Sequence, residues 1–151
     1  MLRLSKKMLF AIEAVLDIAY HAGPEPVQSR EITRRQDIPR RYLEQALQQL
    51  VRENILSGVR GPKGGYRLAR ERRRISIGDI VRSVKKMETT DDPLRDENGS
   101  DLGVKVVRPM WLVMQAETMK NLDKIDIDSL CGEAQKAGIE SEGRKNLDFT
   151  I

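Results

Sequence analysis

The chain of 151 residues has few of the side chains that usually hold metals, form disulfides or catalyse reactions. It contains one cysteine, Cys131, and one histidine, His21. A single cysteine excludes an internal disulfide and is typical of a reducing, cytosolic compartment. A catalytic histidine needs partners nearby, and the sequence offers no His/Cys cluster and no metal-ligand spacing. We therefore expect neither an enzyme nor a metal site, and no cofactor.

Long apolar runs are also missing, since no stretch approaches the roughly 20 residues that a membrane-spanning helix needs. The first 23 residues combine a basic flank with an apolar stretch, as a signal peptide does. However, Glu13 and Asp17 interrupt that stretch, and no small-residue cleavage site follows it. We interpret the segment as an amphipathic helix of a cytoplasmic protein that has no membrane partner.

Charge is abundant and unevenly distributed. Residues 1–86 carry 19 Lys and Arg against 9 Asp and Glu, whereas residues 87–151 carry 8 against 14. The net charge of +4 is thus the balance of a basic first part at +10 and an acidic second part at −6. A basic segment of this kind is typical of proteins that bind nucleic acid, although a solvated surface with uneven charge remains the simpler alternative.

Apolar residues at helical spacing predict three helices before residue 55. The first covers about 4–21 and ends at Gly23-Pro24. The second runs from Ser29, as its N-cap, to Gln36. A turn at Asp37-Ile38-Pro39 precedes the third, which starts at Pro39 and runs to about Asn54. Leu43, Leu47 and Leu50 form the apolar stripe of this third helix.

The stretch GVRGPKGGYRL, residues 58–68, combines glycines with cations between two short strand-like pieces, 55–57 and 66–68. Glycine with a nearby cation is typical of a backbone that approaches phosphate. A nucleotide-binding loop of the Walker type needs a lysine after its last glycine and a helix behind it. Here Lys63 comes before the glycine pair and a strand follows, so a hairpin that approaches nucleic acid is the better interpretation.

Beyond the hairpin, Ser76 and Asp79 form an approximate capping box for a fourth helix. Residues 88–103 are acidic, rich in helix breakers and without periodicity, which predicts a loop or disorder. A long helix is expected at about 105–124, and its apolar residues Val107, Trp111, Met114 and Leu122 lie near heptad spacing. A short helix at about 127–137, capped by Asp126 or Asp128, precedes a polar tail.

Three helices followed by a two-stranded hairpin describe a winged helix-turn-helix, in which the third helix enters the major groove of DNA. Arginine, glutamine and glutamate on the exposed face of that helix are suited to reading base edges. The hairpin loop becomes the wing tip, where Arg60 or Lys63 can reach a phosphate or a narrow minor groove. The predicted DNA-binding residues are Ser29, Arg40, Arg41, Tyr42, Glu44, Gln45, Gln48, Arg60, Gly61, Lys63, Gly64 and Tyr66.

Four segments together resemble the Rrf2 family of bacterial transcription regulators. They are RLSKK at 3–7, RRYLEQALQQL at 40–50, SGVRGPKGGYRLAR at 57–70 and ISIGDIVRSV at 75–84. The resemblance implies a homodimer held by the long helix near Trp111, with wings that grip the minor grooves of an imperfect palindrome in double-stranded DNA. It also implies that Arg60 is the minor-groove arginine. For Tyr42, phosphate contact and simple packing both remain open.

Iron–sulfur members of the family carry three cysteines in the loop before the long helix, and the corresponding loop here has none. Thiolates hold such clusters, and hard carboxylate ligands do not replace them. The resemblance therefore implies a cluster-free, CymR-like regulator. Binding of a divalent cation by the acidic loop is an alternative, although its carboxylates lack a defined ligand spacing.

The last residues of the chain suggest a partner for such a regulator. Cluster-free members control cysteine metabolism together with O-acetylserine sulfhydrylase. The end of this chain, LDFTI, is similar to serine acetyltransferase tails, which end in isoleucine and insert into the active site of that enzyme. A free C-terminal carboxylate can be captured by backbone donors while neighbouring apolar side chains become buried. The predicted partner-binding residues are Asp148, Phe149, Thr150 and Ile151.

The predicted fold is mainly α, a winged helix-turn-helix with a small β-hairpin wing and a long C-terminal dimerisation helix. We expect a DNA-binding domain at 1–86, a cysteine-free acidic loop at 87–104, a dimerisation helix and short helix at 105–137, and a flexible tail at 138–151. The predicted function is a repressor of cysteine or sulfur metabolism genes. The alternatives are a redox- or ligand-sensing regulator without a cluster, and an adaptor that inhibits a metabolic enzyme through its tail.

Overall fold

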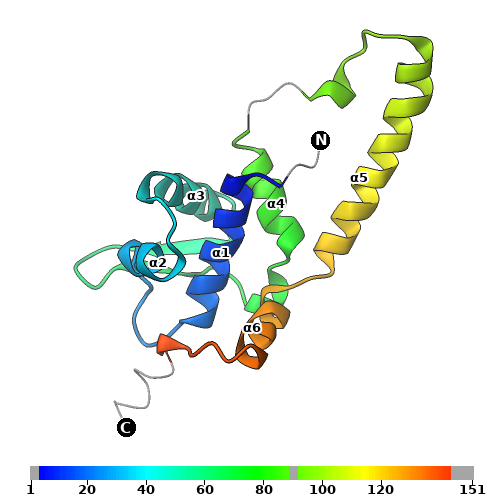
Figure 1. Ribbon diagram of the computed structural model, residues 1–151. Coiled ribbons are helices and arrows are strands. Elements are labelled where there is room, and N and C mark those ends of the chain that lie inside the picture. Colours follow the sequence, from blue (N-terminus) through cyan, green and yellow to red (C-terminus); the bar gives the residue numbers. More distant parts are fainter. Residues whose placement is uncertain (1–3, 89–91, 144–151) are drawn as a thin grey trace.

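The computed structural model describes residues 4–88 and 92–143 of the chain. Its regular elements are six α-helices, two strands and three short helical segments within those residues (Figure 1). In chain order they are α1 (Lys6–Tyr20), α2 (Ser29–Gln36), α3 (Arg40–Arg52), β1 (Leu56–Val59), β2 (Gly65–Leu68), η1 (Arg72–Arg74), α4 (Ile77–Lys85), η2 (Pro93–Arg95), η3 (Gly103–Val107), α5 (Arg108–Asp123) and α6 (Ile127–Lys136).

Helix α1 lies at the centre of the domain, and α2, α3, α4, α6 and β2 pack around it (Figure 1). The Ser5 hydroxyl caps its first turn by accepting a hydrogen bond from the backbone N–H of Met8 at 3.2 Å. Small and branched side chains such as Ala11, Val15 and Ile18 form its buried face. Because alanine lets neighbouring helices approach closely, one short helix can serve as the core of the whole domain.

Helices α2 and α3 form the helix-turn-helix, and two predicted details of their ends are wrong. Gln28, rather than Ser29, is the N-cap of α2, because its side chain and that of Glu31 form a reciprocal capping box. Pro39 is the N-cap of α3, which begins at Arg40. Between the helices, Asp37 adopts a left-handed conformation with φ of 52°, which ends α2 and turns the chain into α3.

Strands β1 and β2 pair antiparallel, with Leu56 opposite Leu68 and Val59 opposite Gly65. The hairpin is longer at its tip than the predicted strand pieces, and it projects from the domain next to α2 (Figure 1). Leu56 is buried while the tip is exposed. The hairpin is therefore buried at its base and exposed at its loop, as a wing requires.

The end of the domain is tied together by backbone hydrogen bonds between α4 and α6. Ser76 and Asp79 form the predicted capping box of α4. Asp126 caps α6, so the first of the two predicted candidates is correct. The N–H of Ile77 bonds to the carbonyl of Ile125, and the N–H of Ile127 bonds to the carbonyl of Ile75. The starts of the two helices are thereby locked side by side.

The segment between α4 and α5 is more structured than the loop predicted for 88–103. It contains the short η2 turn, and helical backbone begins at Asp101 and continues through the π-helical η3 into α5. The predicted start of the long helix at residue 105 is therefore too late. The first residues of this helix include the helix breaker Gly103 and bury no side chain, so no apolar periodicity marks where the helix begins.

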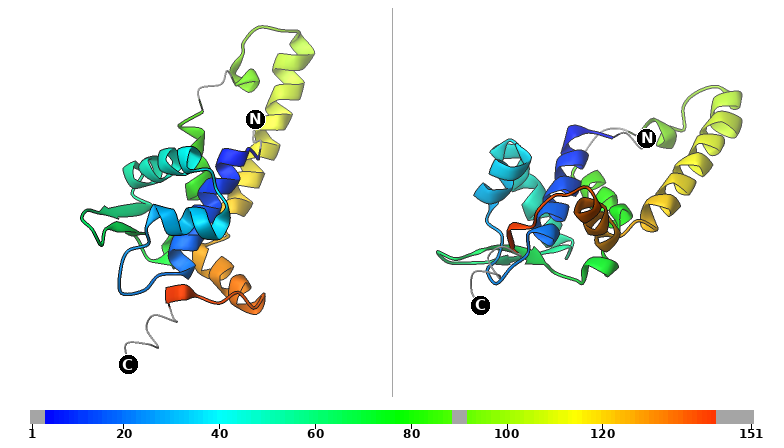
Figure 2. Two further views of the ribbon diagram at one scale, coloured as in Figure 1. Left: turned by 60° about the vertical axis from the view of Figure 1, so that its left-hand side comes forward. Right: turned by 60° about the horizontal axis from the view of Figure 1, so that its bottom comes forward.

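Helix α5 extends away from the rest of the chain in every view (Figures 1 and 2). Its last turns pack on the core through Met119 and Leu122, and Asp123 pairs with Arg82 of α4 at 2.7 Å. Its first turns bury no side chain. The predicted mainly α fold with a small hairpin wing is confirmed, and no helix within 4–88 or 92–143 is both long and apolar enough to span a bilayer.

Candidate DNA-binding surface

The exposed face of α3 presents all six of the side chains that the sequence assigned to it. Helical spacing sends Leu43, Leu47 and Leu50 into the core together with Ala46 and Gln49, so the opposite face of the helix is turned to solvent. The exposed residues are Arg40, Arg41, Tyr42, Glu44, Gln45 and Gln48. Arginine, glutamine and glutamate can all hydrogen-bond to base edges in the major groove. This face therefore has the chemistry of a recognition helix.

Three of these side chains already have partners on the protein. Arg40 Nε donates to Glu44 Oε1 at 2.9 Å, and both side chains are more than half exposed. An exposed pair of this kind contributes at most about 1 kcal/mol, so DNA can exchange it for a phosphate or a base. The ring of Tyr42 is tilted against that of Phe10 at a centroid distance of 6.2 Å while 43% of the residue is exposed. Tyr42 thus packs against Phe10 and still remains accessible to DNA.

The wing tip is shaped by glycines that no other residue could replace without strain. Gly61 has φ of 111°, and the N–H of Gly64 closes the turn by donating to the Gly61 carbonyl at 2.9 Å. A Cβ on Gly64 would lie 2.3 Å from the carbonyl oxygen of Val59. Because these contacts involve backbone, they cannot relax by a side-chain rotation. The tight loop holds Arg60 and Lys63 at its exposed end.

The two wing cations differ in how free they are. Within the described part of the chain, Arg60 has no ion pair and no side-chain hydrogen bond. Lys63 Nζ lies 3.6 Å from Glu25 Oε1, a loose contact in which 82% of the lysine side chain and 63% of the glutamate side chain are exposed. Both cations are available to an incoming polyanion, and Arg60 has no competing carboxylate beside it.

A groove of about 630 Å³ separates the helix-turn-helix from the wing. It contains five of the predicted residues, Ser29, Arg40, Gly61, Gly64 and Tyr66, and it also contains Gln28, Arg30, Thr33, Pro62 and Gly65. Sequence reasoning missed Gln28, Arg30 and Thr33, although Arg30 follows Ser29 at the start of α2, where backbone N–H groups favour phosphate. Its place next to the predicted N-cap Ser29 is a signal in the sequence that could have identified Arg30 as a phosphate-binding candidate.

The wing is fixed relative to α2 by backbone contacts. Val27 and Tyr66 exchange two hydrogen bonds, at 3.0 Å and 2.8 Å, as an isolated antiparallel bridge. The Gln28 side-chain amide reaches the Pro62 carbonyl at 3.5 Å. Tyr66 is half-buried at this junction. Recognition helix and wing consequently form one rigid surface, which limits the conformational entropy lost on binding.

A buried polar cluster holds α2 against α1 from behind the DNA-binding surface. Asp17 is fully buried, and its carboxylate accepts two hydrogen bonds from Arg35, at 2.8 Å and 2.9 Å, and one from Gln36 at 2.8 Å. This bidentate pair satisfies a charge that would otherwise be very costly to bury. Both Arg35 and Gln36 belong to the last turn of α2, so the cluster sets the position of the first helix of the motif.

The segment after α6 adds to this cluster. Glu142 lies 2.5 Å from Arg35 and 3.0 Å from Arg34, and its N–H donates to Nδ1 of His21 at 3.1 Å. Partial burial raises the pKa of Glu142, but the hydrogen bond and charge of Arg35 outweigh it and the pKa lies below its usual value. Burial and the charge of Arg35 lower the pKa of His21. Residues 139–143, here termed the strap, therefore connect the C-terminal part of the chain to α2.

The predicted partner-binding residues Asp148, Phe149, Thr150 and Ile151 lie outside the described residues. Of the twelve predicted DNA-binding residues, the structure brings five together in the groove between the helix-turn-helix and the wing.

The chain is similar to a family of regulators and to several of its members. Residues 4–133 match the Rrf2 family, described as iron-dependent transcriptional regulators. The HTH-type transcriptional regulator IscR of Vibrio cholerae is 41% identical over 152 aligned positions, which cover 99% of this chain and 86% of that protein. IscR of Sodalis glossinidius is 41% identical over 138 residues, covering 83% and 84% of the two chains.

Solved structures with the same arrangement include the IscR of T. potens, which superposes with a TM-score of 0.72 at 30% identity over 93% of both chains. CymR, the global cysteine regulator of B. subtilis, superposes with a TM-score of 0.69 at 25% identity over 88% of this chain and 98% of that one.

The residues of this chain do not fit an iron centre with thiolate ligands. Its one cysteine, Cys131, is buried in α6 and is 5% exposed, and burial raises the pKa of its thiol. The stretch 92–100 has no cysteine and offers only oxygen ligands, from Asp92, Asp96, Glu97, Asn98 and Ser100. Across 4–88 and 92–143, no three or more His, Cys, Asp or Glu side chains gather as metal ligands would.

Proposed function

Because this chain belongs to the Rrf2 family of DNA-binding transcription regulators, we propose that it is a homodimeric repressor that binds an imperfect palindrome in double-stranded DNA. The observation that carries the proposal is the single rigid surface made by the exposed face of α3 and the wing tip. In it, α3 enters the major groove and Arg60 enters the adjacent minor groove. As a DNA-binding regulator it acts in the cytoplasm.

Dimerisation follows from the first half of α5. Five consecutive apolar residues, Met110 to Met114, are each 44–59% exposed, and Val106 and Val107 before them are more than half exposed. Exposed apolar patches of this kind mark interaction sites rather than ordinary surface. A second copy of the chain could bury them by packing its own α5 alongside, which would also place two recognition helices for the two half-sites of a palindrome.

Control of cysteine and sulfur genes is the role that we assign to the repressor. The chain lacks the cysteines that would hold a cluster, and it shares its fold with a regulator of cysteine metabolism. The signal would come from O-acetylserine sulfhydrylase, which captures the residues Asp148, Phe149, Thr150 and Ile151 through the terminal carboxylate. The strap gives such a partner a route to α2, because Glu142 joins the segment that leads to the tail to Arg34 and Arg35.

The DNA proposal is tested by titrating promoter DNA with wild-type protein, with Arg60→Ala and with Arg95→Ala at several salt concentrations. Arg95 is 88% exposed in the loop before α5, so its variant removes the same charge far from the wing. We expect Arg60→Ala to weaken binding about tenfold and to relax the preference for narrow-groove tracts, while Arg95→Ala binds as wild type. Equal binding by all three proteins would contradict the assignment of the wing.

The partner proposal is tested by a calorimetric titration of the sulfhydrylase with the full chain and with a chain that lacks Ile151. Binding should be lost with Ile151, because the terminal carboxylate is then displaced by one residue and the apolar anchor is gone. If both chains bind equally, or neither binds, the enzyme is not captured through this tail.

A further inference from the structure

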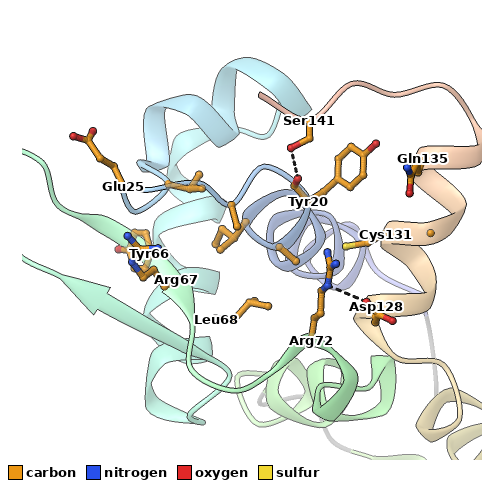
Figure 3. A pocket seen from close by; sticks show the side chains of 15 residues that line it. Tyr20, Glu25, Tyr66, Arg67, Leu68, Arg72, Asp128, Cys131, Gln135 and Ser141 are labelled. Carbon is orange, nitrogen blue, oxygen red and sulfur yellow. Dashed lines mark hydrogen bonds and ion pairs between the residues drawn. The ribbon is translucent and has the colours of Figure 1, made fainter. Parts of the chain in front are cut away.

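A second cavity, of about 600 Å³, lies between the end of α1, strand β2, η1 and α6 (Figure 3). Its volume is in the range of pockets that hold small metabolites. The floor is apolar and consists of buried Ile18, Ala19, Val27 and Cys131 with half-buried Leu68 beside them. Ser141 of the strap closes one side and donates a hydrogen bond to the carbonyl of Tyr20 at 2.7 Å.

The rim of the cavity carries two guanidinium groups, Arg67 and Arg72, and two carboxylates, Glu25 and Asp128, of which Glu25 is exposed and lies 3.6 Å from Lys63. Arg67 donates to the backbone carbonyls of Gly23 and Pro24, which are neutral, so its charge is not compensated by a carboxylate. Arg72 Nε lies 2.9 Å from Asp128, but that carboxylate is shared with Arg73. Figure 3 places the Arg72 guanidinium between Asp128 and Cys131, at the edge of the apolar floor. Guanidinium groups at the edge of an apolar pocket match a carboxylate with a short hydrocarbon chain.

Gly132 supports the interpretation that the cavity between α1 and α6 binds a ligand. It lies in the interior of α6 and lines the cavity, and a Cβ placed on it would meet nothing within 4 Å. A glycine inside a helix is less stable than alanine by about 1 kcal/mol, and no neighbouring group here requires its small size. Its effect is to leave the cavity open next to Cys131.

We propose that this cavity binds a small metabolite with one carboxylate and a short apolar chain, such as an α-amino acid or the corresponding 2-oxo acid. The carboxylate lies against Arg72 at the edge of the apolar floor, and the apolar chain covers the floor between α1 and α6. A bound molecule would connect strand β2 of the wing to α6 and the strap. The site goes beyond DNA binding and capture of the tail, since neither uses Arg72 or Gly132.

The test is a calorimetric titration of the full chain with L-valine, L-methionine and their 2-oxo acids, and with butylamine as the probe without a carboxylate. We expect saturable binding of at least one carboxylate and none of butylamine. Comparison of the amino acids with the 2-oxo acids then shows whether the ammonium group contributes. Absence of binding by all four carboxylates at millimolar concentration would overturn the proposal.

Three variants locate the site. Gly132→Leu fills the cavity from a helix position that tolerates a side chain and should abolish binding. Arg72→Gln should weaken binding at least tenfold. Arg73→Gln is the matched control, because Arg73 pairs with the same Asp128 but is 79% exposed and does not line the cavity. Melting curves for each variant confirm folding, and unchanged affinity in folded Gly132→Leu and Arg72→Gln would overturn the location.

Discussion

Single glycines determine the shape of the wing. Substituting alanine for Gly64 and for Gly58 should have opposite effects, because only the first substitution causes a clash. At Gly64 an added methyl group would lie 2.3 Å from the Val59 carbonyl oxygen and 2.8 Å from that of Gly61. We expect Gly64→Ala to open the turn, to displace Arg60 and Lys63, and to weaken DNA binding about tenfold through the strained backbone. Fluorescence anisotropy with labelled promoter DNA measures the change.

Gly58→Ala is the control for this prediction, because its added methyl group meets nothing within 4 Å in the same hairpin. Alanine restricts the unfolded chain more than glycine, so the free energy of unfolding of Gly58→Ala should equal or slightly exceed that of the wild type. If both variants bind DNA with the wild-type affinity, the close packing of the wing tip does not matter for recognition.

The one histidine makes the attachment of the strap dependent on pH. Nδ1 of His21 accepts the N–H of Glu142, and the side chain is 7% exposed. Burial and the charge of Arg35 place its pKa in the folded protein below the usual value near 6.5. Since the folded state favours the neutral ring, this contribution to stability is complete above pH 6.5. It is lost as the pH falls through the lower pKa of the folded state.

We therefore expect the melting temperature of the wild type to fall more between pH 7.5 and pH 5.5 than that of His21→Asn. Asparagine can offer an acceptor oxygen near the position of Nδ1 but does not titrate. The chain has no other histidine, so the difference between the two curves reports this ring. Parallel curves would show that the strap is insensitive to its protonation.

At the scale of elements, the sequence predicts most of the fold because its helices are amphipathic. In α3 the leucines at 43, 47 and 50 are fully buried and Glu44, Gln45 and Gln48 between them are exposed, so periodicity was sufficient for the recognition face. Periodicity did not predict the helix ends that are determined by tertiary contacts or by the lack of them. Gln28 took the capping role expected of Ser29, and the helix leading to α5 begins before any apolar pattern does.

The candidate site also divides into residues that local sequence patterns predict and residues that only long-range contacts bring in. The recognition face and the wing tip were predictable because each is a local feature of the sequence. The groove residues Gln28, Arg30 and Thr33 join it only because the Val27–Tyr66 bridge folds the wing onto the segment before α2. The bridge spans about forty residues of sequence, and no local pattern encodes it.

Helix α5 is expected to control the oligomeric state. Met114→Glu places a charge inside the apolar stretch from Met110 to Met114, and burying it against a second copy would leave it without a partner. We expect light scattering to give the mass of a dimer for the wild type and of a monomer for the variant, with DNA affinity reduced at least tenfold. Because Met114 is 55% exposed, we expect the substitution to leave the fold of the monomer unchanged.

Asn121→Glu is the matched control, since it adds the same charge to an exposed position of α5 beyond the apolar stretch. It should remain dimeric. A wild type that is monomeric at micromolar concentration, or a Met114→Glu variant that is still dimeric, would show that α5 does not hold the dimer.

At the scale of the whole molecule, the acidic second part of the chain contributes charges that compensate the basic first part. The pairs Arg34–Glu142, Arg35–Glu142, Arg72–Asp128 and Arg82–Asp123 all join a basic residue before 87 to an acidic residue after 120. None of these four pairs uses a residue of α3 or of the wing tip. The uneven charge of the sequence therefore becomes a spatial separation, which leaves the cations of α3 and the wing for DNA.

Removing the strap should weaken the attachment of α2 to the rest of the domain. A chain that ends at Gly138 loses the contacts of Glu142 with Arg34, Arg35 and His21, whereas a chain that ends at Gly143 keeps all of them. Among residues 4–88 and 92–138, Asp17 is then the carboxylate that remains paired with Arg35, and the last turn of α2 is held less firmly. We expect the chain that ends at Gly138 to bind promoter DNA several-fold more weakly and to melt a few degrees lower than the wild type.

The chain that ends at Gly143 should bind DNA and melt like the full protein, even though it lacks every residue proposed to contact the sulfhydrylase. Glu142→Gln, with Glu133→Gln as an exposed control on α6, separates the ion pairs from the rest of the strap. Glu142 pairs with the exposed Arg34 and with the nearly buried Arg35, so we expect Glu142→Gln to bind DNA several-fold more weakly than the wild type. If the chains ending at Gly138 and Gly143 bind DNA equally well, the strap does not position α2. A partner on the tail would then have to act on DNA binding by blocking the surface itself.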